Sequence, residues 1–190
     1  LTNLTELYLR DPVRVEAGPQ ALPPSRISQD VYLVSQMRKT SLFLSLAEQH
    51  RGNVLVFVRT KHGTDRLTRS VRQAGHSVQR LHSGLTQPQR REALEGFRNG
   101  RYRILIATDI AARGIDVMGI DHVINFDLPQ TVEEYVHRIG RTARLDAIGH
   151  ASSFTDTREL SQLHAIERHL GRTLPRCSHD VGAGALTHQS

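Results

Sequence analysis

The amino-acid sequence predicts an α/β fold in which a mostly parallel central sheet lies between two layers of helices. Two observations lead to this prediction. Short apolar runs rich in Val, Ile and Leu recur along the chain, and segments with apolar residues at helical spacing separate them. This alternation is typical of strand–helix–strand units, whose strands are parallel and buried on both faces. With 190 residues, of which 38% are hydrophobic, the chain can form one domain around a sizeable core.

Three strands and two helices are expected in the first half of the chain. The run NVLVFV is rich in β-branched residues and reads as a buried strand. The helix after it carries Leu67, Val71 and Ala74 at helical spacing and ends at Gly75, since glycine is common at helix ends. The expected elements are an edge strand at 28–34, a helix at 37–49, a strand at 53–58, a helix at 60–75 and a short strand at 78–81.

The second half continues the same alternation. Thr131 is expected to cap a helix, because its side chain can accept a backbone N–H and because Glu133 and Glu134 fall in the first turn, where the helix dipole favours carboxylates. The remaining expected elements are a helix at 87–97, strands at 102–107 and 122–126, the helix that Thr131 caps, a strand at 151–155 and an amphipathic closing helix at 160–170.

Composition divides the chain into three segments. Residues 1–25 include a proline-bearing stretch at 18–25 and are expected to form a connector with a short helix. Residues 26–174 carry the alternating pattern and are expected to form the folded domain. Residues 175–190 end in GAGALTHQS, which has no periodicity, and are expected to be a flexible tail.

Charge and cysteine content narrow the class of protein. The net charge of +6 and pI near 10.2 favour a polyanionic partner, although a basic, solvated surface would give the same totals. The single cysteine, Cys177, cannot form an internal disulfide, so a reducing compartment is expected, and the scattered histidines predict no metal site. The sequence shows no long apolar run and no secretory leader, so we expect a cytoplasmic location and no membrane association.

Polar residues follow several of the expected strands directly. In open parallel sheets, ligands bind beyond the carboxyl ends of the strands, so these residues are expected on one rim. Each of them alone could be surface charge or a helix cap, but their joint placement favours a ligand site. They are Arg59, Thr60 and Lys61 after the strand at 53–58, Gln87 and Arg90 after 78–81, and Thr108 to Asp116 after 102–107.

The segment HRIGRTAR, residues 137–144, concentrates three arginines and a histidine with no acid between them. Like charges repel, so an anion is needed to explain the cluster. Each guanidinium presents a fork of donors that matches phosphate oxygens. The segment therefore predicts a phosphate partner.

These motifs resemble those of the second RecA-like domain of DEAD-box RNA helicases of superfamily 2, bacterial type, over residues 1 to about 174. VFVRTK (56–61) resembles motif IV, the pair Gln87 and Arg90 resembles motif IVa, ATDIAARGID (107–116) resembles motif V, and YVHRIGRTAR (135–144) resembles motif VI. The resemblance implies a RecA-like three-layer sandwich, and it implies that residues 1–25 follow a first RecA-like domain that this chain lacks.

The resemblance also implies a nucleotide site shared with that first domain. Arg141 and Arg144 would be arginine fingers on the γ-phosphate of ATP, and His137 would couple the two domains, which makes these three the expected catalytic residues. Asp116 would accept a hydrogen bond from the ribose and, with the two arginines, bind the nucleotide. The chain has no G-x-x-x-x-G-K-[ST] loop and no DEAD box, so the first domain would hold Mg²⁺ and the isolated chain is expected not to turn over ATP. Arg138 is expected to form a structural salt bridge.

RNA, single-stranded or a short duplex, is the second implied partner. Contacts to its backbone would be independent of sequence and salt-dependent, and the 2′-hydroxyl would distinguish RNA from DNA. The implied RNA-binding residues are Arg59, Thr60, Lys61, Gln87, Arg90, Thr108, Arg113 and Gly114.

Taken together, the resemblance implies ATP-dependent, local unwinding of RNA duplexes by a parent protein of which this chain is one half. Two other readings stay open. The chain could be a non-enzymatic RNA-binding or partner-recruiting module, or the equivalent half of a superfamily 2 DNA helicase. Ala143 stands where motif VI usually has glycine, which bears on the position of Arg144.

Overall fold

The computed structural model of the protein describes residues 27–112, 119–142 and 149–178. Within these residues, seven strands form one sheet in the order β3, β4, β2, β5, β6, β1, β7, and all the neighbouring pairs are parallel. The strands are β1 (Ile27–Leu33), β2 (Val54–Phe57), β3 (Val78–Leu81), β4 (Ile104–Ala107), β5 (His122–Asn125), β6 (Gly149–Thr155) and β7 (Arg176–Cys177).

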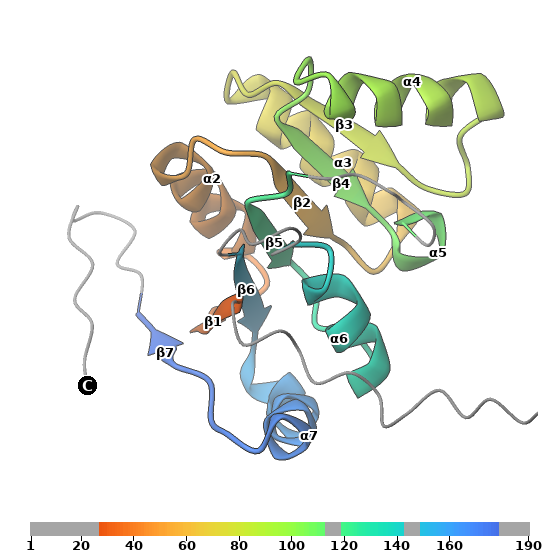
Figure 1. Ribbon diagram of the computed structural model, residues 1–190. Helices are drawn as coiled ribbons and strands as arrows, with labels where there is room; N and C mark the ends of the chain where they lie inside the picture. The colour runs from red at the N-terminus through yellow and green to blue at the C-terminus, as the bar shows by residue number, and fades with distance from the viewer. Residues whose placement is uncertain (1–26, 113–118, 143–148, 179–190) are drawn as a thin grey trace, which may run out of the picture.

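Helices cover both faces of this sheet (Figure 1). On one face lie α2 (Lys39–Gln49) and α3 (Lys61–Gln73). On the other lie α4 (Gln87–Arg98), α5 (Asp109–Ala112), α6 (Val132–Ile139) and α7 (Leu160–Leu170), the last preceded by the short 3₁₀ helix η1 (Thr157–Glu159). The predicted three-layer α/β sandwich is confirmed. Among the helices that the structure describes, none combines the length and hydrophobicity of a membrane-spanning segment.

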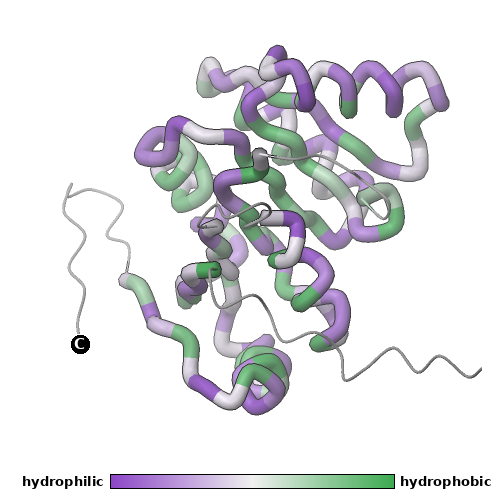
Figure 2. Tube along the Cα trace, in the orientation of Figure 1, coloured by the Kyte–Doolittle hydropathy of each residue, from purple (hydrophilic) through white to green (hydrophobic). Residues whose placement is uncertain are grey.

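The core lies on both faces of the central strands. Every residue of β2 and β4 is buried, and alternate side chains point to opposite faces, as the two-residue period of a strand requires. Val54 and Val56 pack toward α2 and α3, whereas Leu55 and Phe57 pack toward α4 to α7. Figure 2 shows the hydrophobic residues concentrated in these central strands.

Hydrogen bonds within the first turn fix the starts of α3 and α6, close to the positions expected from the sequence. Thr60 and Thr131 lie just before α3 and α6, and the side-chain oxygen of each accepts a hydrogen bond from a backbone N–H of the first turn. Beyond the end of α3, Gly75 has a φ of 87°, a left-handed conformation that glycine adopts without steric cost. These contacts fix where α3 and α6 begin and where α3 ends.

The far end of the sheet differs from the prediction. The strand at 28–34 was expected at the edge, but β7 pairs with β1 beyond it, and the Val31 N–H donates to the Pro175 carbonyl at 2.9 Å. Arg176 and Cys177 thus belong to the sheet, although they lie in the segment predicted as tail. A strand of two residues is too short to show a period in the sequence, so the sequence pattern does not predict it.

Three histidines lie together at the amino ends of the strands. The ring of His122, which is 2% exposed, has its centroid 4.6 Å from those of both His50 and His150. Its Nε2 atom lies 2.9 Å from the Ser152 hydroxyl oxygen. Burial lowers the pKa of His122 to about 2, with further contributions from the two neighbouring histidines. No group of described residues at this or any other place is arranged to hold a metal ion.

This cluster predicts an acid-sensitive domain. His122 stays neutral in the folded protein but titrates near pH 6.5 when the chain unfolds, so its contribution to stability is present above pH 6.5 and is lost as the pH falls below it. We expect the loss of the His122 contribution to lower the free energy of unfolding by about 2 kcal/mol between pH 6.5 and 5. Urea denaturation at several pH values measures this slope. His122→Gln should flatten it and His164→Gln, on the exposed face of α7, should not; equal slopes in the two variants would contradict the assignment.

Candidate functional site

The candidate site lies at the carboxyl ends of three adjacent strands, β4, β2 and β5. Backbone hydrogen bonds keep these ends level with one another. The Val58 N–H donates to the Ala107 carbonyl at 2.9 Å, and the Asp127 N–H donates to the Phe57 carbonyl at 3.3 Å. The residues that follow the strands therefore emerge side by side on one rim, as the sequence predicted.

A buried arginine, Arg138 of α6, ties the rim together. Its Nε and Nη2 atoms donate to the two carboxylate oxygens of Asp109 at 2.6 and 2.7 Å. Its Nη1 atom donates to Asn125 Oδ1 at 3.1 Å and to the Asp127 carbonyl at 2.8 Å, and its guanidinium carbon lies 4.9 Å from the centre of the Phe57 ring. Because Arg138 is only 3% exposed, these contacts replace water almost completely. The structural salt bridge predicted for this residue is confirmed.

His137 and Arg141 lie at the carboxyl end of the same helix. The His137 side chain is exposed, and Arg141, half-buried, follows the helix with its N–H donating to the Arg138 carbonyl at 3.1 Å. Both line a cavity of about 40 Å³ together with Asp109 and Glu134. Cations are favoured at this end of a helix, and here they are brought against motif V. The other two expected nucleotide ligands, Asp116 and Arg144, lie outside the described residues.

Thr108 is placed at the start of α5, directly after β4. Its N–H donates to the Leu81 carbonyl at 3.1 Å, and its carbonyl accepts from Ala111 and Ala112. The first turn of motif V is therefore helical, and the half-buried Thr108 hydroxyl has no partner among the described residues. The expected RNA ligands Arg113 and Gly114, which come next, lie outside those residues.

Gln87 and Arg90 lie in the first turn of α4. Thr86 caps this helix, with its side chain accepting from the Gln89 N–H while the Gln89 side chain accepts from the Thr86 N–H. Gln87 is exposed and Arg90 half-buried. The carboxyl end of β3 pairs with that of β4, so the loop that leads to α4 leaves the sheet beside Thr108.

Arg59, expected to bind RNA, is partly occupied within the domain. Its Nη2 atom donates to Glu159 Oε1 at 2.9 Å and to the Leu128 carbonyl at 3.3 Å, although the side chain stays 45% exposed. The Thr60 side-chain oxygen accepts a hydrogen bond from the Gly63 N–H and so caps α3, and Lys61 is exposed at the first position of that helix. Arg59, Thr60 and Lys61 therefore differ in how many of their polar atoms remain available to a ligand.

Lys39, which the sequence pattern did not single out, supports this side of the rim. Lys39 is buried, and its Nζ lies 3.4 Å from Asp127 Oδ1 and 3.7 Å from Glu159 Oε2. A lysine at the start of a helix is usually a surface residue. The one feature of the sequence that could have drawn attention to Lys39 is the rarity of lysine in this chain, which has only one other, Lys61.

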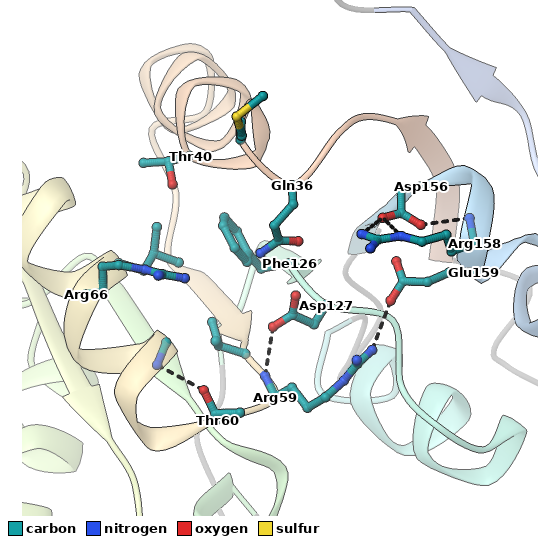
Figure 3. A pocket seen from close by; sticks show the side chains of 14 residues that line it. Gln36, Thr40, Arg59, Thr60, Arg66, Phe126, Asp127, Asp156, Arg158 and Glu159 are labelled. Carbon is teal, nitrogen blue, oxygen red and sulfur yellow. Dashed lines mark hydrogen bonds and ion pairs between the residues drawn. The ribbon is translucent and has the colours of Figure 1, made fainter.

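A groove opens beside motif IV between α2, α3 and η1 (Figure 3). Its volume is about 700 Å³. The wall at α3 carries Thr60 and Arg66, and the wall at η1 carries carboxylates that already have cationic partners. The groove is lined by Gln36, Met37, Thr40, Val58, Arg59, Thr60, Gly63, Arg66, Leu67, Phe126, Asp127, Asp156, Arg158 and Glu159.

Comparison with known proteins agrees with this arrangement. Residues 36–146 match the family model described as the helicase conserved C-terminal domain. The chain is 37% identical over its full length to the DEAD-box ATP-dependent RNA helicase CshA of Bacillus subtilis, and 37% identical over 94% of its length to the RNA helicase CrhR of Synechocystis. It spans only 38% and 37% of these two relatives.

Solved structures show the same likeness. A DEAD-box protein from Methanococcus jannaschii superposes with a TM-score of 0.76 at 34% identity, covering 93% of this chain and 48% of that one. The Escherichia coli DEAD-box protein SrmB, solved bound to the regulator of ribonuclease activity A, gives a TM-score of 0.75 at 33% identity, with 80% of this chain and 90% of that one covered.

Fold, rim and comparisons define the class of domain as a helicase C-terminal, RecA-like domain. Within that class, the chain belongs to the DEAD-box family and is the C-terminal RecA-like domain of a bacterial DEAD-box RNA helicase.

Proposed function

We propose that the parent protein is a cytoplasmic ATP-dependent RNA helicase, and that this domain supplies half of its catalytic centre. The observation that carries the proposal is the exposed end of α6. There, His137 and Arg141 are held against motif V by the buried pair of Arg138 and Asp109. Relatives that share this domain are named ATP-dependent RNA helicases. Dbp5 of Saccharomyces cerevisiae, 32% identical with a TM-score of 0.73 over 80% of this chain and 42% of that one, was solved bound to RNA and ADP BeF3.

Arginine chemistry fits a triphosphate at this end of the rim. The Asp109 carboxylate is paired with the Arg138 guanidinium, and Arg141 and His137 line the cavity beside this pair together with Glu134. In phosphoryl transfer, charge spreads over the oxygens of the transferred group, and a guanidinium that meets them stabilises the transition state. Arg141, joined by Arg144, takes that role, and Asp116 binds the ribose. The first RecA-like domain of the same protein holds Mg²⁺ and most of the ATP.

RNA binds the neighbouring part of the rim through its backbone. Phosphate contacts fix position without reading bases, and the Thr108 hydroxyl and the Arg90 guanidinium suit such contacts. The other proposed contacts come from Arg59, Thr60, Lys61, Gln87, Arg113 and Gly114. Because Thr108 of motif V is followed directly by Asp109, which Arg138 binds, the RNA side and the nucleotide side of the rim are connected through motif V.

ATP turnover by the intact protein tests the proposal. We expect RNA to stimulate hydrolysis in the full-length protein, and we expect residues 1–190 alone to show no turnover with or without RNA, since they lack a phosphate-binding loop. Single-stranded DNA of the same sequence serves as the control and should stimulate poorly. Turnover by the isolated chain would refute the shared site. Equal stimulation by DNA would favour a DNA helicase, and no stimulation by any strand would favour a non-enzymatic module.

A further inference from the structure

The groove beside motif IV is a ready site for a small polar ligand or a segment of a chain. It lies beyond the carboxyl ends of β2, β5 and β6, where ligands of α/β sheets bind. Its volume of about 700 Å³ falls within the range of ligand pockets. Thr60 stands both at its edge and at the start of α3, so the groove continues from the rim that carries Thr108.

The charged side chains of the groove differ in whether they already have partners within the domain. Each of its carboxylates already has donors. Asp127 accepts from Lys39 and from the Arg59 N–H, and Glu159 accepts from Arg59. Asp156 accepts from three nitrogens of Arg158 at 2.5 to 3.1 Å, and these hydrogen bonds hold the pKa of its carboxyl below the ordinary value.

Arg66 is the exception among these charges. No hydrogen bond or ion pair joins its guanidinium to any other described residue, and Figure 3 shows it pointing into the groove from α3. A guanidinium is a five-donor fork that binds phosphate in a planar, two-point manner. The groove therefore presents one uncommitted cation on its α3 wall, opposite acids that are already neutralised.

The other walls suit a nucleobase. Gln36 points into the groove opposite Arg66 (Figure 3), and its amide both donates and accepts hydrogen bonds. Thr40 adds a hydroxyl from α2. Met37 is 92% exposed at the edge of the groove and offers a soft apolar surface, while the buried side chains of Val58 and Phe126 form an apolar floor.

We propose that the groove binds one nucleotide of the RNA strand as the strand passes motif IV, with its phosphate on Arg66 and its base toward Gln36 and Met37. This inference rests on the proposed function and extends the RNA path beyond the rim residues. RNA is favoured over a peptide because Arg66, the one charge of the groove without a partner among the described residues, suits phosphate, and because Thr60 belongs both to the groove and to the rim.

The test compares two arginines of the same helix in the full-length protein. Arg66 lines the groove, whereas Arg69, three residues later, is exposed and does not. Binding of single-stranded RNA is measured by fluorescence anisotropy over a range of salt. Arg66→Ala should weaken binding about tenfold, as expected for one charged hydrogen-bonded contact, and should reduce the salt slope by about 0.7. Arg69→Ala should change neither. Both side chains are exposed, and thermal melting confirms that both variants fold.

RNA carrying a photoreactive base gives a second readout, because the inference requires cross-links to the peptide that contains Gln36 and Met37. Loss of those cross-links in Arg66→Ala supports the groove as part of the RNA path. Identical RNA binding by the two arginine variants, or cross-links confined to the rim, would overturn it and leave a protein partner as the occupant. The proposed function is judged separately, by whether RNA stimulates ATP turnover in the wild-type protein.

Discussion

Replacing Arg141 by alanine in the intact protein is expected to reduce RNA-stimulated ATP turnover by about three to five orders of magnitude, the range that arginine fingers supply in phosphoryl transfer. The loss is in transition-state stabilisation, so it should appear in kcat, while RNA binding in the absence of nucleotide should change little. Steady-state ATPase assays and RNA titrations of the same preparation measure both quantities.

The control for Arg141 is Arg168→Ala, which removes an exposed arginine from the last turn of α7. It should leave turnover unchanged. Thr108→Ala provides the opposite pattern, since it should weaken RNA binding more than it slows turnover at saturating RNA. If Arg141→Ala and Arg168→Ala hydrolyse ATP equally well, Arg141 is not an arginine finger.

Replacing Arg138 by alanine is expected to lower the free energy of unfolding of this domain by about 3–5 kcal/mol, the cost of leaving one member of a buried ion pair without its partner. The variant strands the Asp109 carboxylate and removes the donors to Asn125 and the Asp127 carbonyl. Urea denaturation of residues 1–190 measures the change.

Arg158 offers a matched control for Arg138, because it also binds an aspartate with two side-chain nitrogens, Asp156. The Arg158 side chain is 80% exposed, however, and exposed pairs contribute less than about 1 kcal/mol. Arg158→Ala should therefore be nearly neutral. Similar small losses in both variants would mean that the Arg138 contacts do not stabilise the domain.

The sheet could be predicted from the sequence because its central strands are buried on both faces. β2 and β4 need apolar side chains at every position, and such runs are conspicuous in a chain with 23% charged residues. The cap at Thr131 was predicted as well, because it acts through a contact within the first turn of its own helix; the cap at Thr60 is of the same kind but was not predicted. Interactions of this kind are local and leave a local trace in the sequence.

Long-range contacts left no such trace. β7 owes its place to β1, more than 140 residues earlier in the chain, and its two residues have no apolar period of their own. Lys39 is buried only because Asp127 and Glu159, distant in sequence, converge on it. Neither the strand nor the buried lysine could be found without the tertiary structure.

The candidate site could be predicted from the sequence only in part. The rule that parallel strands present their carboxyl ends at one edge correctly predicted that Thr108 and motif IV would follow neighbouring strands on one rim. A structural role for Arg138 was expected from its place next to His137 in motif VI, but its four oxygen partners were not. The rule could not show that Arg59 spends a guanidinium nitrogen on Glu159, nor that Arg66, outside every motif, remains uncommitted. The roles of Arg113, Gly114, Asp116 and Arg144 stay predictions.

The central claim is that a nucleotide bridges this domain and the first RecA-like domain, with Arg141 facing the γ-phosphate. A crystal structure of the intact protein with single-stranded RNA and a non-hydrolysable ATP analogue tests it most directly. The account predicts a guanidinium nitrogen of Arg141 within hydrogen-bond distance, about 2.7–2.9 Å, of a γ-phosphate oxygen. A closed complex in which Arg141 contacts only residues of its own domain would contradict it.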